Sequence, residues 1–209
     1  MGPDFEMERA AMAAGATRIA GVDEVGRGPL AGPVTAAAVI LDPTCVPAGL
    51  NDSKQLSKKR RTALAEILAE CAEVSVAHAS VEEIEQENIL RASHIAMRRA
   101  IAGLTFAPDL VLIDGSMVPT GLNVRALPVV KGDTRCLSIS AASIVAKIAR
   151  DRIMVDLAQQ HPGYGWETNM GYGSKSHMSA LQNLGVTPHH RRTFRPVHNI
   201  LYQEKNLKL

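Results

Sequence analysis

The stretch Ile19-Ala-Gly-Val-Asp-Glu-Val-Gly-Arg-Gly-Pro-Leu-Ala-Gly-Pro33 joins an apolar run to a glycine-rich turn, with two adjacent carboxylates at the junction. Successive side chains of a strand point to opposite faces, so Asp23 and Glu24 can share a ligand only where the strand ends. Gly26 and Gly28 leave backbone N–H groups uncovered, and the arginine between them adds fixed positive charge. The stretch therefore predicts a strand that runs into a loop suited to a phosphate or a sugar.

The charge is divided unevenly along the 209 residues, although the net value is only +2. Residues 1–130 carry 12 basic and 16 acidic side chains (net −4), whereas residues 131–209 carry 11 and 5 (net +6) and five of the seven histidines. This asymmetry indicates a basic face suited to nucleic acid, although mildly basic surfaces are also common without such a partner.

Three widely separated cysteines, Cys45, Cys71 and Cys136, form no C-x-x-C pair, which favours a reducing, cytoplasmic compartment. No apolar segment approaches the roughly 20 residues needed to cross a bilayer, so we expect no membrane association. Hydrophobic content of 46% and charged content of 21% are ordinary for one globular unit or two small ones.

Apolar runs and periodicity predict alternating strands and helices. Strands are expected at 18–23, 33–41, 73–80, 109–114 and 124–130. Helices are expected after Ser57, at 82–104, at 138–160 and at 175–184, with a loop at 161–174 and a basic tail. The pattern predicts an α/β fold in which helices flank a mixed sheet. We expect a flexible segment at 1–17, a catalytic domain at 18–160 and a small helical extension at 161–209 on the same domain.

Four acids, Asp23, Glu24, Asp114 and Asp133, lie at or just past the ends of predicted strands. Ligands of open α/β sheets bind at the carboxyl ends of the strands. Clustered carboxylates repel one another, and a cation normally relieves that repulsion. Oxygen ligands without Cys or His favour Mg²⁺ or Mn²⁺, and two such ions about 4 Å apart can serve an in-line displacement at a phosphodiester.

Simpler interpretations exist for each feature alone. An acid after a strand is usually a turn former or a helix cap. The glycine loop does not fit a dinucleotide site, because its spacing differs and Pro29 and Pro33 oppose the helix that such a motif opens. No Walker A lysine follows it either.

The chain resembles the ribonuclease HII family, the bacterial type 2 ribonucleases H, over roughly residues 17–200. Five separate blocks occur in the order that this family has. They are Ala20-Gly-Val-Asp-Glu-Val-Gly-Arg-Gly28 with Ala31-Gly-Pro33; Asn51-Asp-Ser-Lys-Gln-Leu-Ser57; Val111-Leu-Ile-Asp-Gly115; Val130-Lys-Gly-Asp133 with Ala141-Ala-Ser-Ile-Val-Ala-Lys147 and Arg150-Asp-Arg152; and Gly171-Tyr-Gly173 with 190–197.

The resemblance implies an RNase H-like fold and a metal-dependent endonuclease that hydrolyses RNA in RNA–DNA hybrids. It also implies incision of duplex DNA 5′ of a single embedded ribonucleotide, giving 3′-hydroxyl and 5′-phosphate ends for ribonucleotide removal. The expected cofactor is Mn²⁺ or Mg²⁺ in a two-metal mechanism, and the expected state is a monomer without an evident protein partner.

The same resemblance implies roles for individual residues. Those matching the catalytic and metal-binding carboxylates are Asp23, Glu24, Asp114 and Asp133. Those matching the substrate-binding positions are Gly26, Arg27 and Gly28, whose backbone senses the ribose 2′-hydroxyl, Tyr172, which packs against the adjacent sugar, and Lys54, in a block that contacts the backbone. A reader of sugars needs backbone donors and a flat side chain rather than base-specific arginines.

Other polar residues stay open at this point. Asp151 is interpreted as a helix-surface or structural ion-pair partner at i, i+4 from Lys147. His177, His189 and His190 match a zinc site poorly, and His177 is an alternative candidate for phosphate contact. Two rival functions remain: another two-metal nuclease of RNase H-like fold, and a non-catalytic hybrid-binding module.

Overall fold

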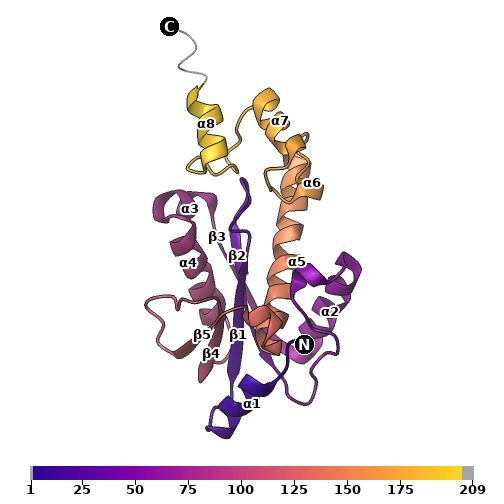
Figure 1. Ribbon diagram of the computed structural model, residues 1–209, viewed down its shortest axis with the longest axis vertical. Helices are drawn as coiled ribbons and strands as arrows, with labels where there is room; N and C mark the ends of the chain where they lie inside the picture. Colours follow the sequence, from indigo (N-terminus) through magenta and orange to yellow (C-terminus); the bar gives the residue numbers. More distant parts are fainter. Residues whose placement is uncertain (1, 204–209) are drawn as a thin grey trace. The chain divides into compact units, whose positions relative to one another are not determined.

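The computed structural model describes residues 2–203, which contain one five-stranded sheet and several helices (Figure 1). Within these residues no helix is long and apolar enough to span a membrane. The chain divides into two compact units. Unit 1 contains the residues up to 25, 35–78 and 93–149, and unit 2 contains 26–34, 79–92 and the residues from 150 on. The domain limits expected at residues 17 and 160 stay predictions.

The sheet has the strand order β3-β2-β1-β4-β5. Its strands are β1 (Ile19–Val25), β2 (Val34–Leu41), β3 (Ala72–Ala79), β4 (Leu110–Asp114) and β5 (Arg125–Val129). β1 pairs antiparallel with β2 and parallel with β4, and β4 pairs parallel with β5. The predicted mixed sheet is therefore confirmed, and its five strands match the five expected apolar runs to within a few residues.

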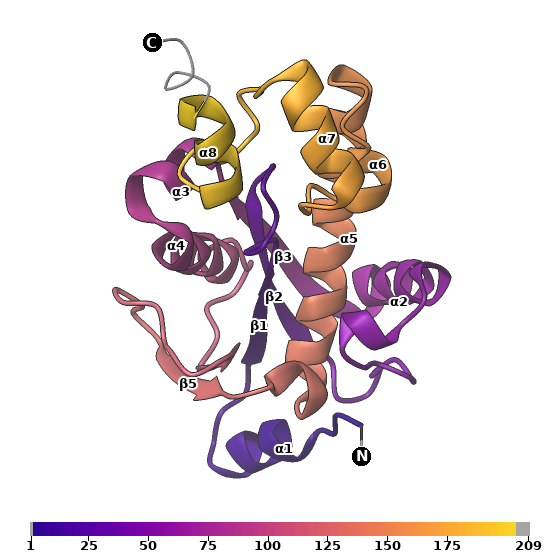
Figure 2. The same cartoon turned by 45° about the horizontal axis from the view of Figure 1, so that its top comes forward.

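Helices cover both faces of the sheet in unit 1. Figure 2 shows α2 (Lys58–Cys71) and the first turns of α5 (Leu137–Gln160) on one side of β1–β3, and α4 (Ile89–Ala102) on the other. Leu64 and Leu68 of α2 pack with Ile144 of α5 and with Val39 and Leu41 of β2. The i, i+4 spacing of the two leucines places both on the buried face of α2.

The N-terminal segment, for which we predicted flexibility, contains α1 (Glu6–Ala13). Its Glu8 is buried, and one carboxylate oxygen accepts hydrogen bonds from the backbone N–H (2.9 Å) and the hydroxyl (2.6 Å) of Ser138. These bonds connect α1 to the first turn of α5.

The single helix predicted at 82–104 is wrong, because the structure has α3 (Val81–Glu87) and α4 with Asn88 between them. Asn88 has a φ of 72° and a ψ of 164°, a sparsely populated backbone conformation that cannot continue a helix. Its side chain accepts hydrogen bonds from the N–H groups of Leu90 (3.0 Å) and Arg91 (3.2 Å). Asn88 thus ends one helix and caps the next, while the apolar periodicity continues across the break.

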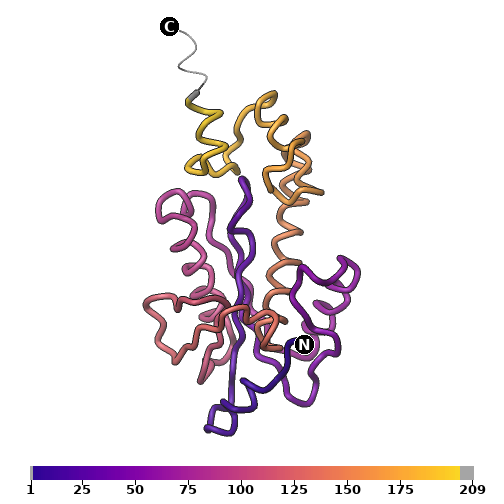
Figure 3. The backbone as a smooth tube through the Cα atoms, viewed as in Figure 1, coloured from indigo at the N-terminus to yellow at the C-terminus, as the bar shows by residue number. Residues whose placement is uncertain are grey.

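Unit 2 has its own hydrophobic core. Leu30 and Ala31, from the loop that joins β1 to β2, pack there with Met154 of α5, Trp166 and Leu181. The unit also contains α6 (Trp166–Asn169), α7 (Lys175–Leu184) and α8 (Arg195–Gln203). Figure 3 traces the backbone from β1 through this loop into β2. The expected C-terminal extension is therefore helical, although α8 falls where the periodicity predicted only a basic tail.

Candidate active site

Strand register brings Asp23 and Asp114 together in unit 1. In the parallel pair β1–β4 the last partners are Val22 and Ile113, so the two aspartates are the next residues of neighbouring strands. β1 itself does not end there, because its pairing with β2 continues to Val25. We expected the two acids to share a ligand because the strand ends beside them. Instead, the pairing of β1 with β4 ends after Val22, which leaves that side of β1 open at Asp23.

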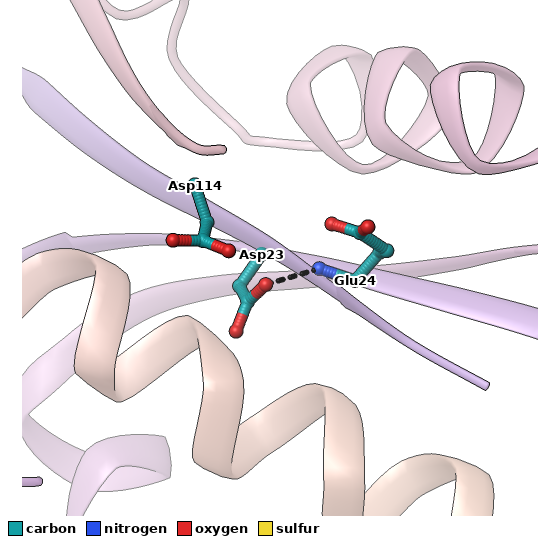
Figure 4. Close-up of side chains that lie close together, drawn as sticks. All are labelled: Asp23, Glu24 and Asp114. Atoms are coloured by element: carbon teal, nitrogen blue, oxygen red, sulfur yellow. Dashed lines mark hydrogen bonds between the residues drawn. The ribbon is translucent and has the colours of Figure 1, made fainter. Parts of the chain in front are cut away.

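Asp23, Glu24 and Asp114 form a compact acidic group. Each offers a carboxylate oxygen, and these oxygens all lie within 4.8 Å of one another. In Figure 4 the carboxylates of Asp23 and Asp114 approach each other, while the Glu24 side chain leaves the strand on the other side of the backbone. Backbone N–H groups orient two of the acids: that of Glu24 donates to Asp23 (2.7 Å), and that of Gly132 donates to Asp114 (2.7 Å).

Asp133 lies beside this group, in the 3₁₀ helix Gly132–Thr134 that follows β5. It is not among the three acids whose oxygens share the 4.8 Å limit, but its charge acts on Asp23. A Cβ on Gly132 would lie 2.5 Å from the Cδ1 atom of Ile139, so a larger residue here would require that side chain to shift.

Lys54 is the cation that the structure places near the acids. Its side chain is 82% exposed, and its Nζ lies 3.9 Å from Asp52 and 4.0 Å from Asp133. Partial desolvation lowers the pKa of Lys54, but the carboxylates of Asp52 and Asp133 raise it overall. An exposed pair at this distance contributes little to stability, so Lys54 is available to a ligand.

The acids shift one another's titration. Burial raises the pKa of Asp23 well above its usual value, and the charges of Glu24, Asp114 and Asp133 raise it further. Burial also raises the pKa of Asp133, followed by the charge of Asp114. The folded chain therefore disfavours the ionised acids until positive charge arrives. Clustered carboxylate oxygens are the hard donors that Mg²⁺ or Mn²⁺ prefers, so these residues fit such an ion.

The glycine-rich loop and the predicted sugar contact meet in unit 2. Gly26 has a φ of 92° and is buried, whereas Arg27 and Gly28 are exposed. A Cβ on Gly28 would lie 3.5 Å from the Cε1 atom of Tyr172, whose side chain is 47% exposed. The structure thus brings Tyr172 to Gly28, on the solvent-accessible part of the loop.

The histidines form a buried network rather than a phosphate contact or a zinc site. His177 and His190 are fully buried, with their Nε2 atoms 3.0 Å apart. Thr187 N–H donates to His190 Nδ1 (3.0 Å), so His190 carries its proton on Nε2 and donates it to His177. His177 Nε2 also accepts from Trp166 Nε1 (3.0 Å), and its Nδ1–H donates to the carbonyl of Tyr172 (2.9 Å). The phosphate alternative for His177 is therefore wrong in this structure, and the network fixes the backbone of Tyr172.

Our sequence analysis missed two buried arginines, Arg150 and Arg191. Both are fully buried and donate to backbone carbonyls of the residues around the glycine loop. Both lie in blocks shared with the family, but periodicity does not distinguish a buried arginine from an exposed one. Asp151 is also buried, and its role in a structural ion pair stays a prediction.

Comparison with known proteins identifies the family. The model of the family described as Ribonuclease HII matches residues 20–199. The chain belongs to the ribonuclease HII family. It is 80% identical over 197 residues to "Ribonuclease HII" of Roseobacter denitrificans, an alignment that covers 94% of this chain and all of the relative. A family member of this similarity is a ribonuclease H, so the protein is an enzyme.

Solved structures agree on the fold. The ribonuclease H2 of Pyrococcus horikoshii OT3 has a TM-score of 0.77 at 25% identity, over 92% of this chain and 100% of that one. Bst-RNase HIII, solved in complex with Mn²⁺, has a TM-score of 0.74 at 19% identity, over 94% of this chain and 73% of that one. The predicted RNase H-like architecture is thereby confirmed.

Proposed function

We propose that this ribonuclease HII cleaves RNA in RNA–DNA hybrids and incises duplex DNA on the 5′ side of single embedded ribonucleotides, leaving 3′-hydroxyl and 5′-phosphate ends. The observation that carries the proposal is the acidic group of Asp23, Glu24 and Asp114 at the carboxyl end of β4, with Asp133 beside it. The continuation of β1 into the loop of Gly26 and Gly28 supports it, because the chain itself keeps the acids and the loop within a few residues of each other.

The four carboxylates are proposed as the ligands of Mg²⁺ or Mn²⁺, with the raised pKa of Asp23 as support. Held by these carboxylates, such ions would supply positive charge to stabilise the negative charge that develops on phosphodiester oxygens during hydrolysis. The chain's own contribution is orientation: the N–H groups of Glu24 and Gly132 fix the Asp23 and Asp114 carboxylates before substrate binds. Bst-RNase HIII, which was solved with Mn²⁺, has the same fold and is consistent with this choice of ion. The use of two ions stays a prediction from the resemblance.

Substrate selection is proposed to depend on the loop, on Tyr172 and on Lys54. Backbone donors at Gly26, Arg27 and Gly28 suit the ribose 2′-hydroxyl, the group that distinguishes RNA from DNA. Tyr172 offers a flat, half-exposed ring beside Gly28 for the adjacent sugar. Lys54, with its exposed ammonium, is proposed to contact a backbone phosphate.

Mapping the cut on a 5′-labelled duplex with one ribonucleotide tests the proposal. We expect divalent-metal-dependent cleavage 5′ of the ribonucleotide, a 5′-phosphate on the downstream product and no cleavage of the all-DNA duplex. Equal cleavage of both duplexes would favour a DNA nuclease of this fold. Binding without metal-dependent cleavage would favour the hybrid-binding module.

Location and assembly are the remaining parts of the proposal. The cysteine content supports action in the cytoplasm, and we expect the protein to work as a monomer without a partner protein. Light scattering at working concentration tests the monomer.

A further inference from the structure

The side chain of Arg191 binds four carbonyl groups of the loop between β1 and β2. Its Nη2 donates to Gly26 (2.6 Å), its Nη1 to Arg27 (3.0 Å) and Pro29 (2.8 Å), and its Nε to Gly32 (3.0 Å). The side chain is fully buried, so these carbonyls replace water around the guanidinium. One side chain thus determines the course of seven loop residues.

Holding a carbonyl also sets the direction of the following N–H group. The described peptide bonds are all trans, and across a trans peptide the C=O of one residue and the N–H of the next point in opposite directions. Since Arg191 holds the carbonyls of Gly26 and Arg27, the N–H groups of Arg27 and Gly28 point away from the guanidinium. Both of these residues are exposed.

A third peptide of the same loop demonstrates the effect. The carbonyl of Pro29 accepts from Arg191 Nη1, and the N–H of the next residue, Leu30, donates to the carbonyl of Gly171 (2.7 Å). The backbone N–H of Arg191 in turn donates to the carbonyl of Leu30 (2.8 Å). Leu30 is buried and its N–H finds a protein acceptor, whereas Gly28 lies at the surface.

We infer that Arg191 is a positioning residue for ribose recognition: it turns the Gly26 and Arg27 peptides so that the N–H groups of Arg27 and Gly28 face the substrate's 2′-oxygen. This inference rests on the proposed function of the loop. A guanidinium suits the task because its five donors form a rigid planar fork, whereas an ammonium presents its donors from one nitrogen. Burial and the charge of Arg150 lower the pKa of Arg191 to about 9, so it remains a cation at neutral pH.

The matched pair Arg191→Lys and Arg150→Lys tests the inference. Arg150 is equally buried in unit 2, but it donates to the carbonyls of Ala31, Pro33 and Met170 instead of those of Gly26 and Arg27. Arg150 also lies against Gly26 through its Nε and Cδ atoms, and lysine retains the Cδ carbon of this contact. Affinity for a duplex with one ribonucleotide and for the all-DNA duplex is measured with chelator present, which prevents cleavage.

We expect Arg191→Lys to lower the ratio of the two affinities by roughly tenfold, the effect of one or two lost hydrogen bonds, while all-DNA binding stays within about twofold. Arg150→Lys should keep the wild-type ratio. A folded Arg191→Lys variant that keeps the ratio overturns the inference, as does an equal loss in both variants, which indicates general destabilisation. If the wild type itself neither cleaves nor prefers the ribonucleotide duplex, the proposed function fails first.

A measurement on the wild type covers the case in which Arg191→Lys does not fold. In an NMR titration with the ribonucleotide duplex, the amide resonances of Arg27 and Gly28 should shift more than they do with the all-DNA duplex. The Leu30 amide, which is bonded to Gly171, should respond equally to both. Equal responses of all three amides overturn the inference.

Discussion

The acidic group of unit 1 and the glycine loop of unit 2 differ in the charges that surround their buried polar groups. Around Asp23 the strongest electrostatic neighbours are other carboxylates, and the pKa of Asp23 is raised by burial and then by their charges. Around the loop, the buried guanidinium of Arg191 is surrounded by the carbonyl groups that it binds. The first region concentrates negative charge, whereas the second uses its donors to fix a backbone shape.

This difference indicates what each region does with a ligand. Concentrated negative charge gives a site affinity for cations at the cost of stability in their absence. A backbone held by internal hydrogen bonds gives selectivity, because its outward groups need no rearrangement when the ligand binds. Variants that remove charge and variants that loosen the loop should therefore fail in different assays.

Asp23→Asn should have the largest effect, on activity alone. We expect cleavage of the ribonucleotide duplex to fall by at least about 1,000-fold, which corresponds to roughly 4 kcal/mol of lost transition-state stabilisation. The folded-state pKa of Asp23 is raised, so its contribution to stability is present below the unfolded pKa and is lost as pH rises through the folded pKa. At neutral pH without metal, the neutral asparagine should thus melt no lower than the wild type.

Asp156→Asn is the control for that variant, because it removes an acid from an exposed position on α5. Its cleavage rate should match the wild type. Cleavage within about tenfold of the wild type by Asp23→Asn, or a melting temperature far below that of the wild type, would contradict the assigned role.

The second largest difference between the two regions should appear in how a divalent metal ion changes the stability of their variants. A divalent ion at 100 times its dissociation constant stabilises the folded state by about 2.7 kcal/mol if it binds only that state. We expect Mg²⁺ or Mn²⁺ to raise the urea midpoint of the wild type relative to chelator, and to raise it much less for Asp23→Asn. Arg191→Lys, which leaves the acids intact, should keep the full metal effect. An equal metal effect in wild type and Asp23→Asn would place the ion elsewhere.

The sequence predicted the acidic group better than its surroundings. The sequence places Asp23 and Asp114 at the ends of predicted strands, where open α/β sheets bind ligands. It does not show that these strands are neighbours; the parallel pairing of β1 with β4 comes from the structure. The strand end that we expected at Asp23 and Glu24 is absent, because β1 continues past Glu24 and loses only its pairing with β4.

The parts that sequence analysis missed depend on tertiary contacts. The break at Asn88 leaves the apolar period unchanged, so only the backbone conformation shows it. Arg191 and His177 are polar residues that pattern reasoning places at the surface, and their burial depends on carbonyl and imidazole partners more than ten residues away in the chain. Sequence patterns give the faces of elements but not the partners of buried polar groups.

Tyr172→Ala tests the substrate-facing edge of the loop region. A lost stacking contact costs about 1–3 kcal/mol, so we expect cleavage at a single ribonucleotide to fall roughly 10- to 100-fold. Tyr202→Ala is matched in type and exposure, because Tyr202 is 50% exposed against 47% for Tyr172. Tyr202→Ala should retain the wild-type cleavage rate. Asp151→Ala should lower the rate less than Tyr172→Ala does. Equal losses in the two tyrosine variants would remove the sugar contact from the proposal.

The smallest expected effect is a pH dependence of stability that comes from the histidine network of unit 2. Burial, together with the charges of His177, His189 and His161, lowers the pKa of His190 to about 3. A depressed folded-state pKa gives stability that is present above the unfolded value of about 6.5 and is lost as pH falls toward 3, by up to about 1.4 kcal/mol per pH unit. Trp166, the single tryptophan of the chain, donates to His177 and reports unfolding of this region by fluorescence.

His190→Gln should have a lower urea midpoint at pH 7.5 than the wild type, because it loses the bond to His177, but a smaller decrease between pH 6.5 and 5.5. A decrease that is unchanged in His190→Gln would assign the proton uptake to other groups. The histidine network would then no longer count as a difference between the two units, and only the acids and the loop carbonyls would distinguish them.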